Sequence, residues 1–113
     1  MKVPYNYLPM QFSKHEEIFD EWKELISTTE FTLGPYVENF EREFAEFIGC
    51  KHVIGTNTGT DALILALKAI GVGPGDEVLS VPITFFATVG AIIAVGARPV
   101  FVDIDDRYQM DVN

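Results

Sequence analysis

The sequence predicts an α/β fold, because short apolar runs typical of buried strands alternate with apolar residues at helical spacing. The strand-like runs cover residues 52–56, 77–82 and 100–104, and helical patterns over 60–70 and 84–95 separate them. Strands joined by helices that fill a crossover indicate a parallel sheet covered by helices on both faces. With 48% apolar residues, the chain is expected to bury a core.

Two helices are expected before the first strand. Apolar residues at spacings of three and four predict a helix over residues 14–28. Ser13 is expected to cap this helix, with Glu16 three residues later completing a capping box. Phenylalanines at helical spacing predict a second helix over residues 35–48, which begins at a proline and ends before a glycine.

Composition excludes several classes of partner. The formal net charge is −9 and only 8 residues are Lys or Arg, which argues against a nucleic-acid or anionic-membrane partner. The apolar stretch 85–95 is too short to span a bilayer, and the amino terminus has no secretory pattern, so a cytoplasmic address is expected. Cys50 is the single cysteine; this excludes an internal disulfide, and we expect its side chain to be buried.

The segment from Gly55 to Leu63 joins the first strand-like run to a helix through glycine and hydroxylic residues. At such a turn the first backbone N–H groups have no partner within the helix and the helix dipole is positive, so a phosphate fits. This turn alone does not distinguish a phosphate site from a simple helix cap, so both interpretations stay open. Asp61 would repel a phosphate unless its carboxylate points outward, so we expect only its backbone N–H to face the anion.

No metal site is predicted. Asp103, Asp105 and Asp106 follow the last strand and could hold a hard cation, but a solvated acidic loop is the favoured interpretation. His15 and His52 are isolated and lack the spacing of metal ligands.

Six short motifs occur in one order along the chain: Leu33-Gly34-Pro35, Phe40 to Ala45, Asn57 to Leu63, Gly73 to Val78, Thr84 to Thr88, and Gly96 to Asp103. In this order they resemble the amino-terminal part of sugar aminotransferases of the DegT/DnrJ/EryC1/StrS family. These are pyridoxal-phosphate (PLP) enzymes of fold type I. The resemblance covers nearly the whole chain.

This resemblance implies that residues 1–113 are the start of the large PLP-binding domain, a three-layer αβα structure with a mainly parallel sheet. Residues 1–34 would form an amino-terminal helix and loop, and residues 35–113 the start of the α/β sheet. Open α/β sheets usually have five or more strands, whereas three are predicted here. We therefore expect the chain to be a fragment of a longer protein.

The resemblance also assigns cofactor-binding residues. Gly59, Thr60 and the backbone of Asp61 match the family's phosphate contacts, and the Thr60 hydroxyl can add a donor. Phe85 matches the aromatic residue that stacks on the pyridine ring of PLP. By pattern alone, Phe85 in its apolar stretch reads as a core residue, and only the resemblance reverses that interpretation.

The catalytic residues of the family are absent from the sequence. The chemistry needs a lysine that forms a Schiff base with the cofactor and an aspartate that keeps the pyridine nitrogen protonated. None of the lysines stands in the family's Ser-x-x-x-x-Lys setting: Lys2, Lys14, Lys23, Lys51 and Lys68. These 113 residues alone are expected to be inactive.

The implied function is amination of a nucleotide-linked keto sugar in aminosugar biosynthesis, with glutamate as amino donor. Family members are homodimers with active sites at the subunit interface, so the loop 32–35 and the amino-terminal helices are candidate dimer contacts. Three alternatives stay open: a PLP-dependent sugar dehydratase of the same family, a non-catalytic phosphate-binding module, and a mononucleotide-binding domain. The last is disfavoured because Gly55 and Gly59 do not have the G-x-G-x-x-G spacing.

Overall fold

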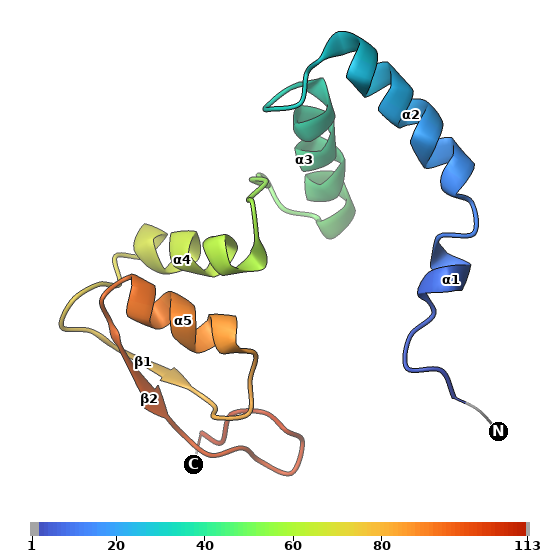
Figure 1. The fold of residues 1–113 in the computed structure, drawn as a ribbon. Coiled ribbons are helices and arrows are strands. Elements are labelled where there is room, and N and C mark those ends of the chain that lie inside the picture. The colour runs from blue at the N-terminus through green and yellow to red at the C-terminus, as the bar shows by residue number, and fades with distance from the viewer. Residues whose placement is uncertain (1–2, 113) are drawn as a thin grey trace. The chain divides into compact units, whose positions relative to one another are not determined.

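The computed structural model describes residues 3–112. Its helices and strands are, in chain order, α1 (Leu8–Gln11), α2 (His15–Thr28), α3 (Pro35–Ile48), α4 (Gly59–Ala69), β1 (Glu77–Ser80), α5 (Phe86–Ala94) and β2 (Arg98–Phe101) (Figure 1). The chain forms two compact units, Met1–Ile54 and Gly55–Asn113. The division into residues 1–34 and 35–113 stays a prediction. None of the helices described has the length and apolar character that a bilayer span requires.

The start of α2 differs from the sequence prediction. Lys14 occupies the N-cap position without a side-chain hydrogen bond, so the expected capping box of Ser13 and Glu16 is wrong. The Ser13 hydroxyl instead donates to the carbonyl oxygen of Met10 at 2.8 Å. That carbonyl belongs to α1, a short helix that the periodicity did not reveal, and it competes for the hydroxyl that would have capped α2.

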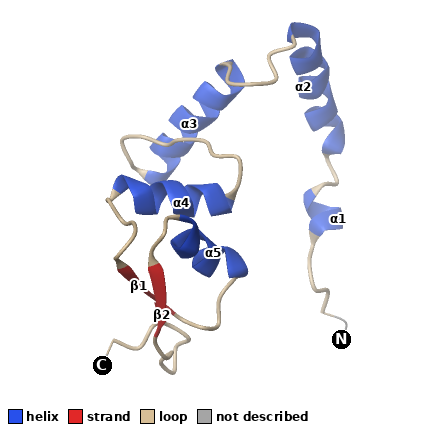
Figure 2. Cartoon of the chain, turned by 60° about the vertical axis from the view of Figure 1, so that its left-hand side comes forward, coloured by secondary structure: helices blue, strands red, loops and turns tan. Residues whose placement is uncertain are grey.

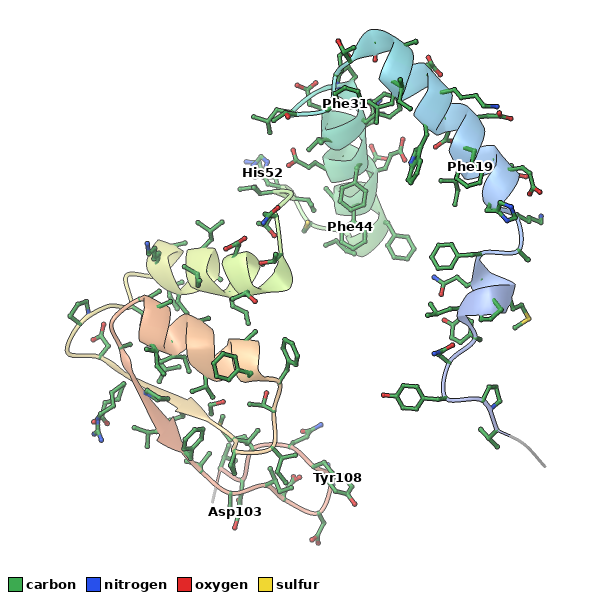
Figure 3. The ribbon with its side chains drawn as sticks, viewed as in Figure 1. Phe19, Phe31, Phe44, His52, Asp103 and Tyr108 are labelled. Carbon is green, nitrogen blue, oxygen red and sulfur yellow. The ribbon has the colours of Figure 1, made fainter. Side chains whose placement is uncertain are left out.

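The bounds of α3 match the predicted range. Pro35 occupies a first-turn position, where its missing N–H costs nothing, and Gly49 ends the helix with a left-handed φ of 71°. Phe40, Phe44 and Phe47 form a row along the helix, with ring centroids 5.5 Å and 6.2 Å apart. All three rings are exposed within the described residues, and Figure 3 labels Phe44 in this row.

Residues 52–56 do not form the predicted strand: they lie in a loop, and the described sheet consists of β1 and β2. Ile54, within this loop, is 78% exposed. A strand exists only by hydrogen bonding to a neighbour, and the two strands described pair with each other. Cys50, expected to be buried, is also exposed, and its thiol lies 3.2 Å from the carbonyl oxygen of His52.

The predicted parallel pairing of β1 and β2 is confirmed, with Glu77 opposite Arg98 and Ser80 opposite Phe101. Arg98 donates its backbone N–H to Asp76 at 2.9 Å, and Arg98 and Glu77 form an ion pair. Pairing therefore begins two residues earlier than the expected range 100–104. Val78 packs toward α5, whereas the neighbouring Leu79 is 56% exposed, so α4 and α5 leave its face of the sheet uncovered.

A small core holds the second unit together. Ile92, Val95 and Ala97 are buried, and partly buried side chains of α4, β1 and the loop between them pack against these three: Ile64, Leu67, Val72 and Val78. The predicted helices over 60–70 and 84–95 are confirmed as α4 and α5, with ends that differ by one or two residues. The helices pack side by side and begin at the same end (Figures 1 and 2).

Gly96 makes the turn from α5 into β2 in the left-handed region, with a φ of 84°. A Cβ at this position would lie 2.9 Å from Cγ of Pro74. Gly71 has the same φ of 84°, but a Cβ there would meet nothing within 4 Å. A side chain at either glycine would strain the backbone equally, but only at Gly96 would it also clash with a neighbour. Comparing substitutions at the two positions therefore distinguishes backbone strain from a steric clash.

We predict that Gly96→Ala destabilises the chain more than Gly71→Ala does. Both substitutions carry the left-handed penalty of about 1–2 kcal/mol. Gly96→Ala adds a clash with the Pro74 ring, an overpacking effect of about 1–3 kcal/mol. Urea unfolding of the two variants measures the difference, and equal losses would show that the ring moves aside freely.

Candidate functional site

Thr58 caps α4 with its side chain. Its backbone is extended, with φ −148° and ψ 162°, and its hydroxyl oxygen accepts the backbone N–H of Asp61 at 3.0 Å. The same hydroxyl donates to Oδ2 of Asp61 at 3.1 Å. This reciprocal pair is a capping arrangement between the N-cap residue and the third helical residue. The Thr-x-x-Asp spacing could have revealed it in the sequence.

The cap determines which donors at this turn are committed. The Asp61 N–H and one carboxylate oxygen are bonded to Thr58, so the carboxylate turns back toward the cap. The N–H groups of Gly59 and Thr60 make no hydrogen bond within residues 3–112. A Cβ added at Gly59 would meet only open space. Two neighbouring N–H donors at a helix amino terminus can receive an anion.

A cavity of about 390 Å³ lies beside the turn, lined by Gly55, Thr56, Asn57, Asp61, Ile64 and Leu65. Of the predicted cofactor-binding residues, only Asp61 lines it. The cavity therefore occupies the flank of α4, and the donors of Gly59 and Thr60 do not line it.

Phe85 occupies the N-cap position of α5, with φ −69° and ψ 141°. Phe85 is 80% exposed within the described residues, so it is not a core residue of this unit. No side chain caps α5 at Phe85. Instead, the Thr84 hydroxyl donates to the Thr88 hydroxyl at 3.1 Å, a contact that sequence reasoning did not reveal.

The predicted residues are brought to one end of the second unit. Gly59, Thr60 and Asp61 form the first turn of α4, and Phe85 immediately precedes α5. The two helices pack side by side and begin at the same end (Figures 1 and 2). The free donors in the first turn of α4 therefore lie at the same end of this helix pair as Phe85, which precedes α5. The chain reaches α5 directly from the carboxyl end of β1, and ligands of parallel α/β sheets bind at that edge.

The acidic segment after β2 forms a closed loop, on which Figure 3 labels Asp103 and Tyr108. One carboxylate oxygen of Asp105 accepts the backbone N–H groups of Arg107 and Gln109, both at 2.9 Å. A carboxylate oxygen of Asp103 accepts the N–H of Ile104 at 2.8 Å. These carboxylates hold the turn. Over residues 3–112 no group of three His, Cys, Asp or Glu side chains is arranged to bind a metal.

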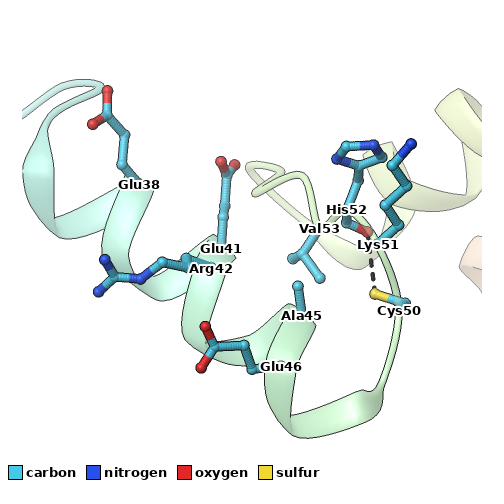
Figure 4. Close-up of a pocket in the computed structure, with 9 residues that line it drawn as sticks. All are labelled: Glu38, Glu41, Arg42, Ala45, Glu46, Cys50, Lys51, His52 and Val53. Atoms are coloured by element: carbon cyan, nitrogen blue, oxygen red, sulfur yellow. Dashed lines mark hydrogen bonds between the residues drawn. The ribbon is translucent and has the colours of Figure 1, made fainter.

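A second cavity, of about 420 Å³, lies in the first unit (Figure 4). One side of α3, from Glu38 to Glu46, and the segment after the helix form this cavity, where Ala45 and Val53 face each other. Its other lining residues carry charges of both signs or polar groups: Glu38, Glu41, Arg42, Glu46, Cys50, Lys51 and His52. None of the predicted cofactor-binding residues lies in it, and the mixed charges select neither an anion nor a cation.

A family model described as the DegT/DnrJ/EryC1/StrS aminotransferase family matches residues 13–113. The spore coat polysaccharide biosynthesis protein SpsC of Bacillus subtilis is 50% identical over 105 residues, which are 93% of this chain and 26% of that protein. The dTDP-3-amino-3,4,6-trideoxy-alpha-D-glucose transaminase of Micromonospora megalomicea is 42% identical over 110 residues, 96% of this chain and 29% of that protein. The chain thus spans less than a third of the length of these relatives.

Solved structures of the same aminotransferase family superpose on this chain. A DegT DnrJ EryC1 StrS aminotransferase from Brucella abortus superposes with a TM-score of 0.88 and 37% identity, covering 98% of this chain and 30% of that one. NtdA from Bacillus subtilis, solved with bound cofactor PMP, gives a TM-score of 0.82 and 39% identity, covering 92% of this chain and 24% of that one. The predicted fold class, the amino-terminal part of a fold type I large domain, is confirmed.

We predict that Thr58→Val destabilises the chain by about 1 kcal/mol, because the Asp61 N–H and carboxylate both lose their partner. Thr58→Ser keeps the hydroxyl and should retain most of the stability. Urea unfolding of the two variants tests the cap. A serine variant as unstable as the valine variant would assign the loss to the methyl group and not to the hydrogen bonds.

Proposed function

Because the chain belongs to the DegT/DnrJ/EryC1/StrS aminotransferase family, we propose that the complete protein containing it aminates a nucleotide-linked keto sugar, with PLP as cofactor and glutamate as amino donor. Relatives support the substrate class: one is named a dTDP-amino-sugar transaminase, and another a UDP-N-acetyl-3-dehydro-alpha-D-glucosamine aminotransferase. The observation that carries the proposal is the pair of uncommitted N–H donors at Gly59 and Thr60, in a helix that begins at the same end as α5, which Phe85 precedes.

The residues present fit the two ends of PLP. Its phosphate would accept the N–H groups of Gly59 and Thr60, and the Thr60 hydroxyl can donate as well. The exposed face of Phe85 would cover the pyridine ring, a stacking contribution of about 0.5–1.5 kcal/mol beyond area burial. When bound, PLP supplies an electron sink and a carrier for the amino group.

Asp61 contributes less to phosphate binding in this proposal than Gly59 and Thr60 do. Its N–H is bonded to the Thr58 hydroxyl, so a phosphate would receive that N–H only in place of Thr58. Its carboxylate is held by the same hydroxyl, which keeps the negative charge at a defined place in the first turn. We infer that Gly59 and Thr60 supply the main phosphate donors, and that Asp61 adds its N–H only where the phosphate displaces the Thr58 hydroxyl.

The reacting groups lie elsewhere in the proposed enzyme. In the family setting a lysine moves the protons and an aspartate keeps the pyridine nitrogen protonated, and neither motif occurs in this sequence. We propose that the complete protein supplies both, and that the 113 residues alone bind without catalysing. A dehydratase of the same family would differ at this lysine.

We further propose that the enzyme acts as a homodimer in the cytoplasm, without a nucleic-acid or membrane partner. The net charge of −9 supports the absence of polyanionic partners. In the first unit, Leu33 in the loop 32–35 and Phe31 just before it are largely exposed, and the rings of Phe40, Phe44 and Phe47 along α3 are exposed as well. Exposed apolar side chains in such numbers are typical of surfaces that a partner covers.

We predict that the complete protein develops a visible absorbance band when PLP is added, because the cofactor becomes covalently joined to a lysine. Borohydride should fix the cofactor on a single lysine, which peptide mass spectrometry identifies. A dehydratase would bind PLP without that attachment. The absence of any PLP-dependent absorbance change would rule out the aminotransferase proposal.

We predict that Thr60→Val weakens PLP binding on the order of tenfold, because a hydrogen bond to a charged phosphate is lost. Thr60→Ser is the matched control and should bind like the unmodified protein. Titration of the absorbance change gives both dissociation constants. Equal affinities for all three proteins would remove the hydroxyl from the phosphate site and leave only backbone donors.

A further inference from the structure

Two threonines bracket Phe85 and are bonded to each other. Thr84 directly precedes Phe85, and Thr88 lies one helical turn later. The Thr84 hydroxyl donates to the Thr88 hydroxyl at 3.1 Å, and the Thr88 N–H donates to the carbonyl oxygen of Phe85 at 3.0 Å. Two hydrogen bonds therefore span the backbone at Phe85: one between the two threonine side chains and one between backbone groups.

The ring of Phe85 has little else to orient it. Its side chain is largely exposed, and it makes no ring contact among the aromatic pairs of residues 3–112. Phe86, the next residue, is exposed to a similar degree and so does not pack Phe85 into a core. The direction of the Phe85 Cα–Cβ bond then depends on its backbone angles, where extended geometry changes to helix.

The arrangement differs from an ordinary helix cap. An N-cap hydroxyl usually accepts a backbone N–H of the first turn, as Thr58 does in α4. At α5 the hydroxyl comes from the residue before the N-cap, and its partner is another side chain. This bond spans the change in backbone direction at Phe85 and closes a loop around that residue.

We propose that Thr84 and Thr88 are positioning residues, whose hydroxyl–hydroxyl bond fixes the orientation in which Phe85 presents its ring to the cofactor. This inference rests on the proposed function, in which Phe85 stacks on PLP. Neither threonine touches the cofactor in this proposal. The bond lowers the number of orientations that the free ring samples, so less ordering remains to be done on binding.

The test uses the complete protein and four single variants: Thr84→Val, Thr88→Val, Thr88→Ser and Phe85→Ala. The valine variants keep the branched shape and remove the hydroxyl. We expect each valine variant to bind PLP about 2- to 10-fold more weakly, the effect of one neutral hydrogen bond. The visible circular dichroism of bound PLP should also weaken, because it reports how rigidly the cofactor is held. Thr88→Ser should restore both readouts.

Two double variants test whether the bond acts through Phe85. Thr84→Val combined with Thr88→Val should bind no more weakly than either single variant, since both remove the same bond. Thr88→Val should have no further effect on affinity when Phe85 is already alanine. If Thr88→Val weakens binding equally with and without the Phe85 ring, the threonines act by another route and the proposal is wrong.

The outcomes separate this inference from the proposed function. Should Phe85→Ala leave the PLP affinity unchanged, the stacking role fails, and the positioning role fails with it. Should Phe85→Ala weaken binding while both valine variants match the unmodified protein, only the positioning role is overturned. The thermal unfolding midpoint without cofactor identifies a variant that fails to fold. If Thr88→Val fails to fold, Thr84→Val takes its place in the combination with Phe85→Ala, because Thr84 lies before the helix.

Discussion

The packing of α5 between α4 and the strands is the interaction on which the second unit depends. Ala91 is fully buried and Ile92 nearly so, and small residues on this side of α5 allow its neighbours to approach closely. Because burial of apolar area is the main favourable term in folding, this face determines where α4 and β1 lie. The same packing makes α4 and α5 begin at one edge. The candidate cofactor site is a consequence of that arrangement.

The amino termini of the two helices use threonine in different ways. In α4, Thr58 satisfies the Asp61 N–H and leaves the two preceding donors open. In α5, the Thr84 hydroxyl bonds to another side chain and not to the backbone. A helix end must satisfy or expose its first N–H groups, and the choice of partner decides whether a ligand can replace water there. One end therefore offers donors, and the other holds an aromatic ring.

Exposed apolar surface is the other general feature of the chain. The phenylalanine rings along α3 and the side chain of Leu79 on β1 are exposed within residues 3–112. Surfaces of this kind usually mark contacts with further chain or with a partner. These exposed surfaces agree with the proposal of a longer, dimeric enzyme. The relatives support the greater length, because this chain spans only 26% and 29% of two of them.

The sequence by itself determined α3, α4 and α5, because helical periodicity and glycine or proline boundaries lie within each segment. It also indicated the parallel pairing of β1 with β2, because a helix fills the crossover between these two strands. The range of α3 was predicted to the residue, and α4 and α5 to within two. The order of motifs also identified Gly59, Thr60, Asp61 and Phe85 as candidates. Their placement at one edge required the packing of α4 on α5, which no local pattern encodes.

Only the tertiary structure decided the features that depend on a distant or competing partner. Residues 52–56 are apolar like a strand, but strand formation needs pairing with a neighbouring strand, and the described sheet contains only β1 and β2. Ser13 has the right residue type for a cap, but the carbonyl of Met10 takes its hydroxyl. The Thr84 hydroxyl could have bonded to water alone, but α5 places the Thr88 hydroxyl within hydrogen-bond distance. Local preference is set by neighbours along the chain, whereas hydrogen-bond partners and exposure are set by what lies across space.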